Sequence, residues 1–142
     1  MITIAKRFTF DAAHHIDTMP DNHKCRRMHG HTYEVEVELR GPAQADGMVM
    51  SYEDLADVWS RLHDKLDHRV LNEVPGLEVP TTEALVLWLF DHLVALLGGA
   101  LLQAVTVRES STTWARLTRD DWFNTRRGVG TLGFDPAFKA ST

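Results

Sequence analysis

Three histidines in this 142-residue chain have a spacing that suits a metal ion. His29 and His31 lie two residues apart, so on a β-strand both rings point to the same face. His14 shares its parity with the apolar residues of an earlier stretch, which places it on the corresponding face of a second strand. If these strands pair as a long antiparallel hairpin, facing Cβ atoms lie roughly 4.5–5.5 Å apart. The spacing therefore predicts that the three rings converge.

Three converging imidazoles can share one tetrahedral cation and leave its fourth position open, which is typical of catalytic rather than structural sites. Zinc is the metal that we favour, although iron or nickel also suits such ligands. Any one histidine alone is more often a surface or core residue. The metal prediction therefore depends on all three rings lying together.

The single cysteine, Cys25, lies four residues before His29 in a basic loop with Lys24, Arg26 and Arg27. A lone cysteine is usually an inert, small apolar residue, but positive neighbours favour the reactive thiolate. Two interpretations stay open beside the metal. Cys25 is either a fourth metal ligand, which would close the site, or a general base, which we favour.

Two carboxylates add to this set. Asp67 directly precedes His68, and a carboxylate that orients a histidine tunes a proton carrier, although this pair is a weak signal by itself. Glu109 ends the apolar parity of a later strand, where a buried carboxylate needs a partner. It either reaches solvent or accepts the bidentate, amidine-like edge of a ligand.

The order of the expected elements is ββααββ. We expect strands at residues 2–14, 29–40, 101–110 and 113–117. Between them, one amphipathic helix begins at the N-cap Ser51, and a second is capped by Thr81 or Thr82 and stopped by Gly98. Glu83 suits the positive end of the second helix. This order predicts an α+β domain with a four-stranded antiparallel sheet and two helices on one face.

One strand carries Glu34, Glu36 and Glu38 on the face opposite its apolar residues. That face must be wet or must line a solvent-filled lumen. The domain is expected to span residues 1–118, and residues 119–142 form a C-terminal extension to which the sequence assigns no role.

Composition restricts the possible partners and compartment. The net charge of −5 does not favour nucleic acid or an anionic membrane. The most apolar stretch, residues 84–97, is shorter than the roughly 20 residues of a membrane span. The N-terminus lacks the pattern of a signal peptide, and one cysteine forms no internal disulfide. We therefore expect a cytoplasmic protein.

Five collinear motifs resemble the 6-pyruvoyl-tetrahydropterin synthase family, and within it the bacterial 6-carboxy-5,6,7,8-tetrahydropterin synthases. They are "FDAAH", "HKCRRMHGH", "LDHRVLN", "PTTE" and "VRES", and the resemblance covers residues 2–117. It implies the tunnelling fold (T-fold), in which subunits join their sheets edge to edge. It further implies a homohexamer, built as a dimer of trimers, with active sites between subunits.

The resemblance also implies roles for single residues. Zinc would be held by His14, His29 and His31, and catalysis would depend on Cys25, Asp67 and His68. Glu109 would anchor the pterin, and Thr81, Thr82 and Glu83, at the helix start near the pterin pocket, would also bind the substrate.

The implied reaction converts 7,8-dihydroneopterin triphosphate to 6-carboxy-5,6,7,8-tetrahydropterin, triphosphate and acetaldehyde, on a route to queuosine or another 7-deazapurine. The spacing from Cys25 to His29 matches the carboxy-forming branch. Three alternatives stay open: triphosphate elimination that stops at 6-pyruvoyl-tetrahydropterin, pterin or zinc binding without catalysis, and a three-histidine zinc hydrolase. The last lacks its usual water-positioning partner.

Overall fold

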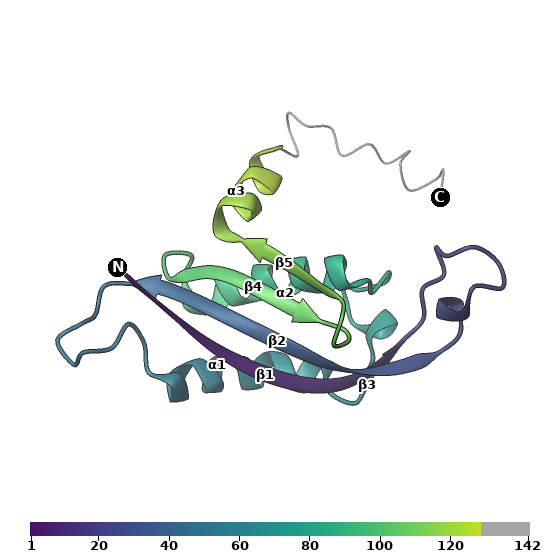
Figure 1. Cartoon of the computed structure of the whole chain (residues 1–142), viewed down its shortest axis with the longest axis horizontal. Helices are drawn as coiled ribbons and strands as arrows, with labels where there is room; N and C mark the ends of the chain where they lie inside the picture. The colour runs from purple at the N-terminus through teal and green to yellow at the C-terminus, as the bar shows by residue number, and fades with distance from the viewer. Residues whose placement is uncertain (129–142) are drawn as a thin grey trace.

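The first two strands form one long antiparallel hairpin in the computed structural model, which describes residues 1–128 (Figure 1). β1 covers Ile2–His14 and β2 covers His29–Gly41. The register pairs the first residue of β1 with the last of β2, and His14 with His29 at the other end. The predicted hairpin and its parity are therefore confirmed.

Two further strands extend this hairpin in the expected antiparallel sense. β4 (Leu102–Arg108) pairs with β2, and β5 (Trp114–Thr118) pairs with β4. The predicted four-stranded antiparallel arrangement is therefore present.

A fifth, two-residue strand was not predicted, and it makes the sheet mixed. β3 (Arg69–Val70) runs parallel to β1 beside Ala12 and Ala13, so the strand order is β3-β1-β2-β4-β5. His68 precedes it with a positive φ of 55°, and the His68 N–H donates to the Asp11 carbonyl at 2.6 Å. This long-range bond turns the chain from the end of a helix onto the edge of β1.

Two long helices cover one face of the sheet, as expected (Figure 1). α1 spans Tyr52–Leu66 and α2 spans Thr82–Leu97. Ser51 and Thr81 are their N-caps, and each side-chain oxygen accepts a backbone N–H from three residues further on. The core between helices and sheet includes Phe10, Tyr33, Val35, Val37, Leu39, Leu55, Leu62, Leu85, Leu89, Val105 and Val107.

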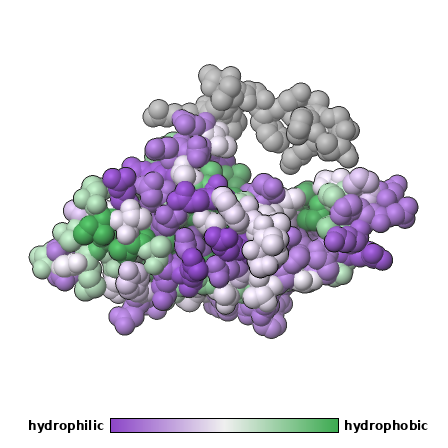
Figure 2. Space-filling model, in the orientation of Figure 1, coloured by the Kyte–Doolittle hydropathy of each residue, from purple (hydrophilic) through white to green (hydrophobic). Residues whose placement is uncertain are grey.

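The opposite face of the sheet is charged but paired. The Arg7 Nε lies 2.7 Å from Glu36 Oε2, and Arg116 Nη2 lies 2.6 Å from Glu38 Oε2. Hydrophilic residues accordingly cover much of the strand face turned to the viewer in Figure 2. The glutamates thus form ion pairs across neighbouring strands, which their own strand's sequence did not indicate.

Short elements connect and complete this frame. Two 3-10 turns, η1 (Lys24–Arg26) and η2 (Leu71–Glu73), lie in the connections. A third helix, α3 (Arg119–Gly128), lies in the segment predicted to be a C-terminal extension, and residues 129–142 of that segment lie outside the described residues. Among residues 1–128, the helices fall short of the length and apolarity that crossing a bilayer requires.

Candidate active site

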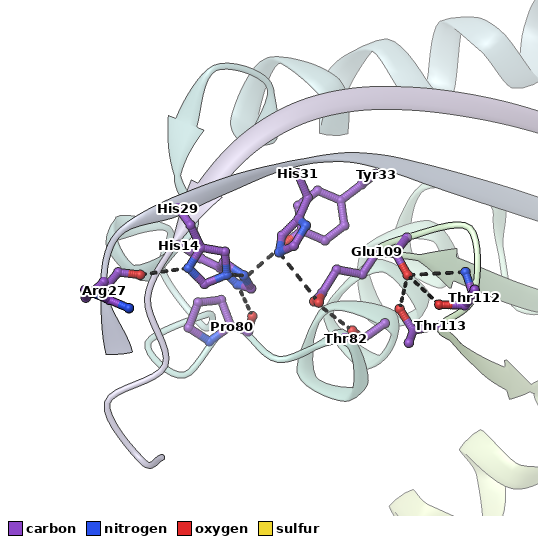
Figure 3. Close-up of polar contacts among 11 residues, drawn as sticks. His14, Arg27, His29, His31, Tyr33, Pro80, Thr82, Glu109, Thr112 and Thr113 are labelled. Atoms are coloured by element: carbon purple, nitrogen blue, oxygen red, sulfur yellow. Dashed lines mark hydrogen bonds and ion pairs between the residues drawn. The ribbon is translucent and has the colours of Figure 1, made fainter. Parts of the chain in front are cut away.

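The far end of the β1–β2 hairpin brings the three predicted histidines together (Figure 3). The ring centroids lie 4.5 Å apart for His14 and His29, and 5.0 Å apart for each pair that includes His31. One ligand atom from each ring lies within 4.8 Å of the others. The predicted convergence of the rings is therefore confirmed.

Hydrogen bonds from the backbone orient two of these rings. His14 Nδ1 lies 2.9 Å from the Pro80 carbonyl oxygen, and His29 Nδ1 lies 2.7 Å from that of Arg27. A carbonyl only accepts, so each Nδ1 carries the proton and each Nε2 lone pair is free. The two Nε2 atoms lie 3.0 Å apart. Burial lowers the pKa of His14, which keeps this ring neutral and able to bind a cation.

The ring of His31 shows whether a metal ion fits this group of histidines. His31 Nε2 is buried, and no group of the described residues forms a hydrogen bond with it. A buried polar atom without a partner is costly, and a cation shared with the other two Nε2 atoms would satisfy it. The donor set therefore fits a metal ion, which His14, His29 and His31 would hold.

A cavity of about 500 Å³ opens beside this cluster. It is lined by Lys24, Cys25, Arg27, Met28, His29, His31 and Glu109. The position of Cys25 follows from η1, where the Cys25 N–H donates to His23 Nδ1 at 3.1 Å. Cys25 and two rings of the histidine cluster thus line one cavity, an arrangement that the predicted base beside a metal ion would need.

The basic residues around Cys25 divide into two groups. Lys24 and Arg27 line the cavity, whereas the Arg26 guanidinium donates to the carbonyls of Asp17 and Met19 inside the loop. Arg26 therefore stabilises the loop, whereas Lys24 and Arg27 are placed where an anionic ligand could contact them.

Glu109 lies across the cavity, beside the start of α2. Its Oε1 is 3.6 Å from His31 Nε2, and its Oε2 accepts a hydrogen bond from Thr82 Oγ1 at 3.1 Å (Figure 3). Thr81 caps α2, and the Glu83 side chain is exposed in the first turn. Of the three predicted pocket residues at this helix start, Thr82 contacts the site directly.

Asp67 and His68 form the expected pair, and His68 lines a different cavity, of about 510 Å³, which shares only His31 with the cavity beside Cys25. His68 Nδ1 lies 2.7 Å from Asp67 Oδ2, and the Asp11 N–H donates to Asp67 Oδ1 at 3.0 Å. The hydrogen bond to Asp67 raises the pKa of His68, and the Asp11 N–H is the main cause that lowers the pKa of Asp67. Within one protomer, Cys25 and His68 therefore line different cavities.

Sequence reasoning missed two contacts of the cluster. Tyr33, a residue of the apolar face of β2, has its hydroxyl 3.3 Å from His14 Nδ1, and Pro80 supplies the carbonyl for the same atom. The parity that joins Tyr33 to His31 contained the first signal. No local pattern indicates the second, because Pro80 is 66 residues from His14.

Comparison with known proteins agrees with this geometry. The family model for 6-pyruvoyl tetrahydropterin synthase matches residues 3–120. A relative from Archaeoglobus fulgidus is 38% identical over 78% of this chain and 90% of its own length. The 6-carboxy-5,6,7,8-tetrahydropterin synthase of Synechocystis is 38% identical over 82% of this chain and 92% of its own.

A solved structure confirms the expected T-fold. The 6-pyruvoyl tetrahydropterin synthase of Caenorhabditis elegans superimposes with a TM-score of 0.75 at 28% identity, covering 82% of this chain and 94% of the other. The five motifs, the hairpin-borne histidine cluster and these matches agree. The chain belongs to the 6-pyruvoyl tetrahydropterin synthase family of enzymes.

Proposed function

We propose that this protein converts 7,8-dihydroneopterin triphosphate and water to 6-carboxy-5,6,7,8-tetrahydropterin, triphosphate and acetaldehyde, with zinc as its metal ion. The observation that carries the proposal is the single cavity lined by Cys25, Glu109 and two rings of the histidine cluster. The name of the Synechocystis relative supports the same activity. We further propose that the product serves 7-deazapurine synthesis, such as that of queuosine, in the cytoplasm.

The residues of this cavity divide the work. When bound by the three histidines, zinc supplies Lewis-acid polarisation of the substrate's side-chain oxygens. Cys25 removes a proton from that side chain. The Glu109 carboxylate accepts the amino and ring N–H edge of the pterin as a bidentate acceptor. Lys24 and Arg27 provide positive charge for the triphosphate, despite the negative charge of the whole chain.

His68, oriented by Asp67, returns a proton on the other side of the substrate. Because His68 and Cys25 line different cavities of one protomer, we propose that a neighbouring subunit supplies His68 to each site. This arrangement requires an oligomer, and we propose a homohexamer built from two trimers. Light scattering of the purified protein should then give about six times the 16.1 kDa chain mass.

The test of the proposed function uses Cys25→Ala. The variant should keep its zinc and lose turnover by about 10²–10⁴-fold, the usual contribution of a positioned base. Triphosphate and acetaldehyde release are the measurements, and Met28→Ala, from the same cavity wall, is the matched control. Full turnover by zinc-loaded Cys25→Ala would refute the assignment of the base.

The mass of the product separates the alternatives. A carboxylate with acetaldehyde supports the proposed reaction, and a three-carbon ketone indicates 6-pyruvoyl-tetrahydropterin instead. A protein that binds the pterin but releases no triphosphate is a binding protein without catalysis.

A further inference from the structure

The segment Pro80–Thr82, which leads into α2, contacts both halves of the proposed site (Figure 3). The Pro80 carbonyl oxygen lies 2.9 Å from His14 Nδ1, and Thr82 Oγ1 lies 3.1 Å from Glu109 Oε2. His14 belongs to the histidine cluster, and Glu109 is the proposed pterin anchor. Three consecutive residues therefore contact both His14, the last residue of β1, and Glu109, which directly follows β4.

The Pro80 contact acts on the metal side. His14 is only 2% exposed, so an N–H at Nδ1 needs a hydrogen-bond acceptor within the protein. The Pro80 carbonyl accepts it and thereby leaves the Nε2 lone pair directed at His29 Nε2, 3.0 Å away. Groups that fix the tautomer and orientation of a ligand histidine usually contribute strongly to metal affinity.

The Thr82 contact acts on the pterin side. A carboxylate with one oxygen held by a hydroxyl has a restricted plane, and the other oxygen of Glu109 faces the cluster, 3.6 Å from His31 Nε2. Bidentate recognition of a planar ligand edge needs both oxygens in one fixed plane. Orienting the carboxylate before binding lowers the entropic cost of association.

Thr81 holds the whole segment. Its Oγ1 accepts the Ala84 N–H at 3.1 Å, and its own N–H donates to the Val79 carbonyl at 2.9 Å, which closes a three-residue turn around buried Pro80. The first bond fixes the start of the helix that carries Thr82. The second fixes the direction of the Pro80 carbonyl.

We propose that Thr82 and Thr81 are positioning residues with separable effects. Thr82 orients Glu109 alone, whereas Thr81 holds both Glu109, through Thr82, and His14, through Pro80. This assignment replaces the expectation that both threonines bind the substrate themselves. The pterin half of this proposal, which concerns Glu109, rests on the proposed function because it takes Glu109 as the pterin anchor. The metal half, which concerns His14, does not rest on it.

The first experiment compares Thr82→Val, which loses the hydroxyl, with Thr82→Ser, which keeps it. Neopterin is the probe, titrated by fluorescence into the zinc-loaded full-length oligomer. Thr82→Val should weaken neopterin binding about tenfold, and Thr82→Ser should stay near wild type, because only the former loses the hydrogen bond to the carboxylate. Zinc affinity, measured by competition with a chromophoric chelator, should be unchanged in both.

The second experiment replaces Thr81 by Val, with Thr81→Ser as the cap-retaining variant. Thr81→Val should weaken both neopterin and zinc binding, each by about three- to tenfold, and serine should restore both. Ser51→Ala is the matched control, because it removes the equivalent cap of α1. It should lower the unfolding midpoint and leave both affinities at wild type.

The variant Glu109→Gln distinguishes a failure of the role proposed for Thr82 from a failure of the proposed function. If Glu109→Gln loses neopterin binding but Thr82→Val does not, the role of Thr82 is wrong and the proposed function stands. If Glu109→Gln binds neopterin like wild type, the pterin anchor of the proposed function fails, and the pterin half fails with it. A Thr81→Val variant with wild-type zinc affinity overturns the metal half.

Discussion

Tyr33 contacts the histidine cluster through both its ring and its hydroxyl. The ring packs edge-on against His14 and His31, with centroid distances of 6.1 and 5.6 Å, and the hydroxyl lies 3.3 Å from His14 Nδ1. Burial raises the pKa of Tyr33, so the hydroxyl stays neutral over the working pH range. A single core residue thus restricts two of the three proposed ligands.

Replacing Tyr33 by Phe tests this contact. The variant keeps the ring and loses the hydroxyl, so zinc affinity should fall by about three- to tenfold, at or below the lower end of outer-shell effects. Chelator competition measures the affinity, and the spectrum of the cobalt-substituted protein reports ligand geometry. Tyr52→Phe, at the other and exposed tyrosine, is the control. Equal affinities for the two variants would show that the hydroxyl is dispensable.

The Asp67–His68 pair predicts the pH dependence. Its hydrogen bond raises the pKa of His68 above 6.5, so His68 stays protonated to a higher pH than a free histidine. If His68 donates a proton, kcat/KM should fall as pH rises through that raised pKa. Asp67→Asn removes the cause, so this alkaline limb should move to lower pH. An unmoved limb would assign it to another group.

The same pair has a defined linkage to stability. For His68, whose pKa is raised by folding, the stabilisation is fully present below pH 6.5 and is lost as pH rises through the raised value. For Asp67, whose pKa is lowered, the stabilisation is present above 3.8 and is lost as pH falls through the lowered value. Both contributions are therefore present together between pH 3.8 and pH 6.5.

At the scale of elements, α3 attaches the described part of the extension to α2. The Trp122 ring stacks on Phe90 at 5.5 Å between centroids, and its Nε1 donates to Asp91 Oδ1 at 2.7 Å. Arg126 pairs with the second oxygen of Asp91. The helix begins at Arg119, and the family match ends one residue later, at residue 120. It therefore packs against the middle of α2, the helix whose first residue is Thr82.

Trp122→Ala should undock this helix. Fully buried tryptophans cost roughly 3–5 kcal/mol when truncated, so the half-buried Trp122 should cost roughly 2 kcal/mol. The urea midpoint at fixed protein concentration measures the loss, and Trp114→Ala, at a residue 58% exposed, is the control. Zinc affinity should stay unchanged because the cluster lies on β1 and β2. Equal midpoints for the two variants would contradict the docking.

At the scale of the whole molecule, both edges of the sheet are available for further strands. β5 forms one edge, and at the other edge β3 covers only Ala12 and Ala13 of β1. Exposed edges favour pairing with another chain, which fits subunits that join edge to edge. The separation of Cys25 and His68 within one protomer is the second observation that supports the proposed oligomer.

Mixing two inactive variants tests this sharing of sites. Cys25→Ala and His68→Ala, denatured and refolded together at equal amounts, should regain about a quarter of wild-type activity. With random assembly, the subunit that supplies Cys25 is intact at that residue with a probability of about one half, and the same holds for the neighbour that supplies His68. A working site needs both, so about one quarter of the sites are active. Each variant refolded alone is the control. No recovery in mixtures that reach wild-type oligomer size would indicate that one subunit supplies both residues.

The strand parity and the helix caps could be predicted from the sequence alone. Period-2 alternation placed His14, His29 and His31 on one face, and the cap at Ser51 was predicted to the residue. These features depend on neighbours a few positions away, because pleat and capping are local geometry. The hairpin register followed from the same alternation, since a one-residue slip would expose its apolar face.

The tertiary structure alone decided which distant groups meet. The Pro80 carbonyl at His14, the Asp11 backbone at Asp67, and β3 beside β1 join residues more than 50 positions apart. Such contacts are set by how α1 and α2 pack on the sheet, and no periodic pattern along the chain encodes them. The histidines able to bind a cation could therefore be predicted from the sequence. The groups that orient them, such as the Pro80 carbonyl, are brought into place only by tertiary packing.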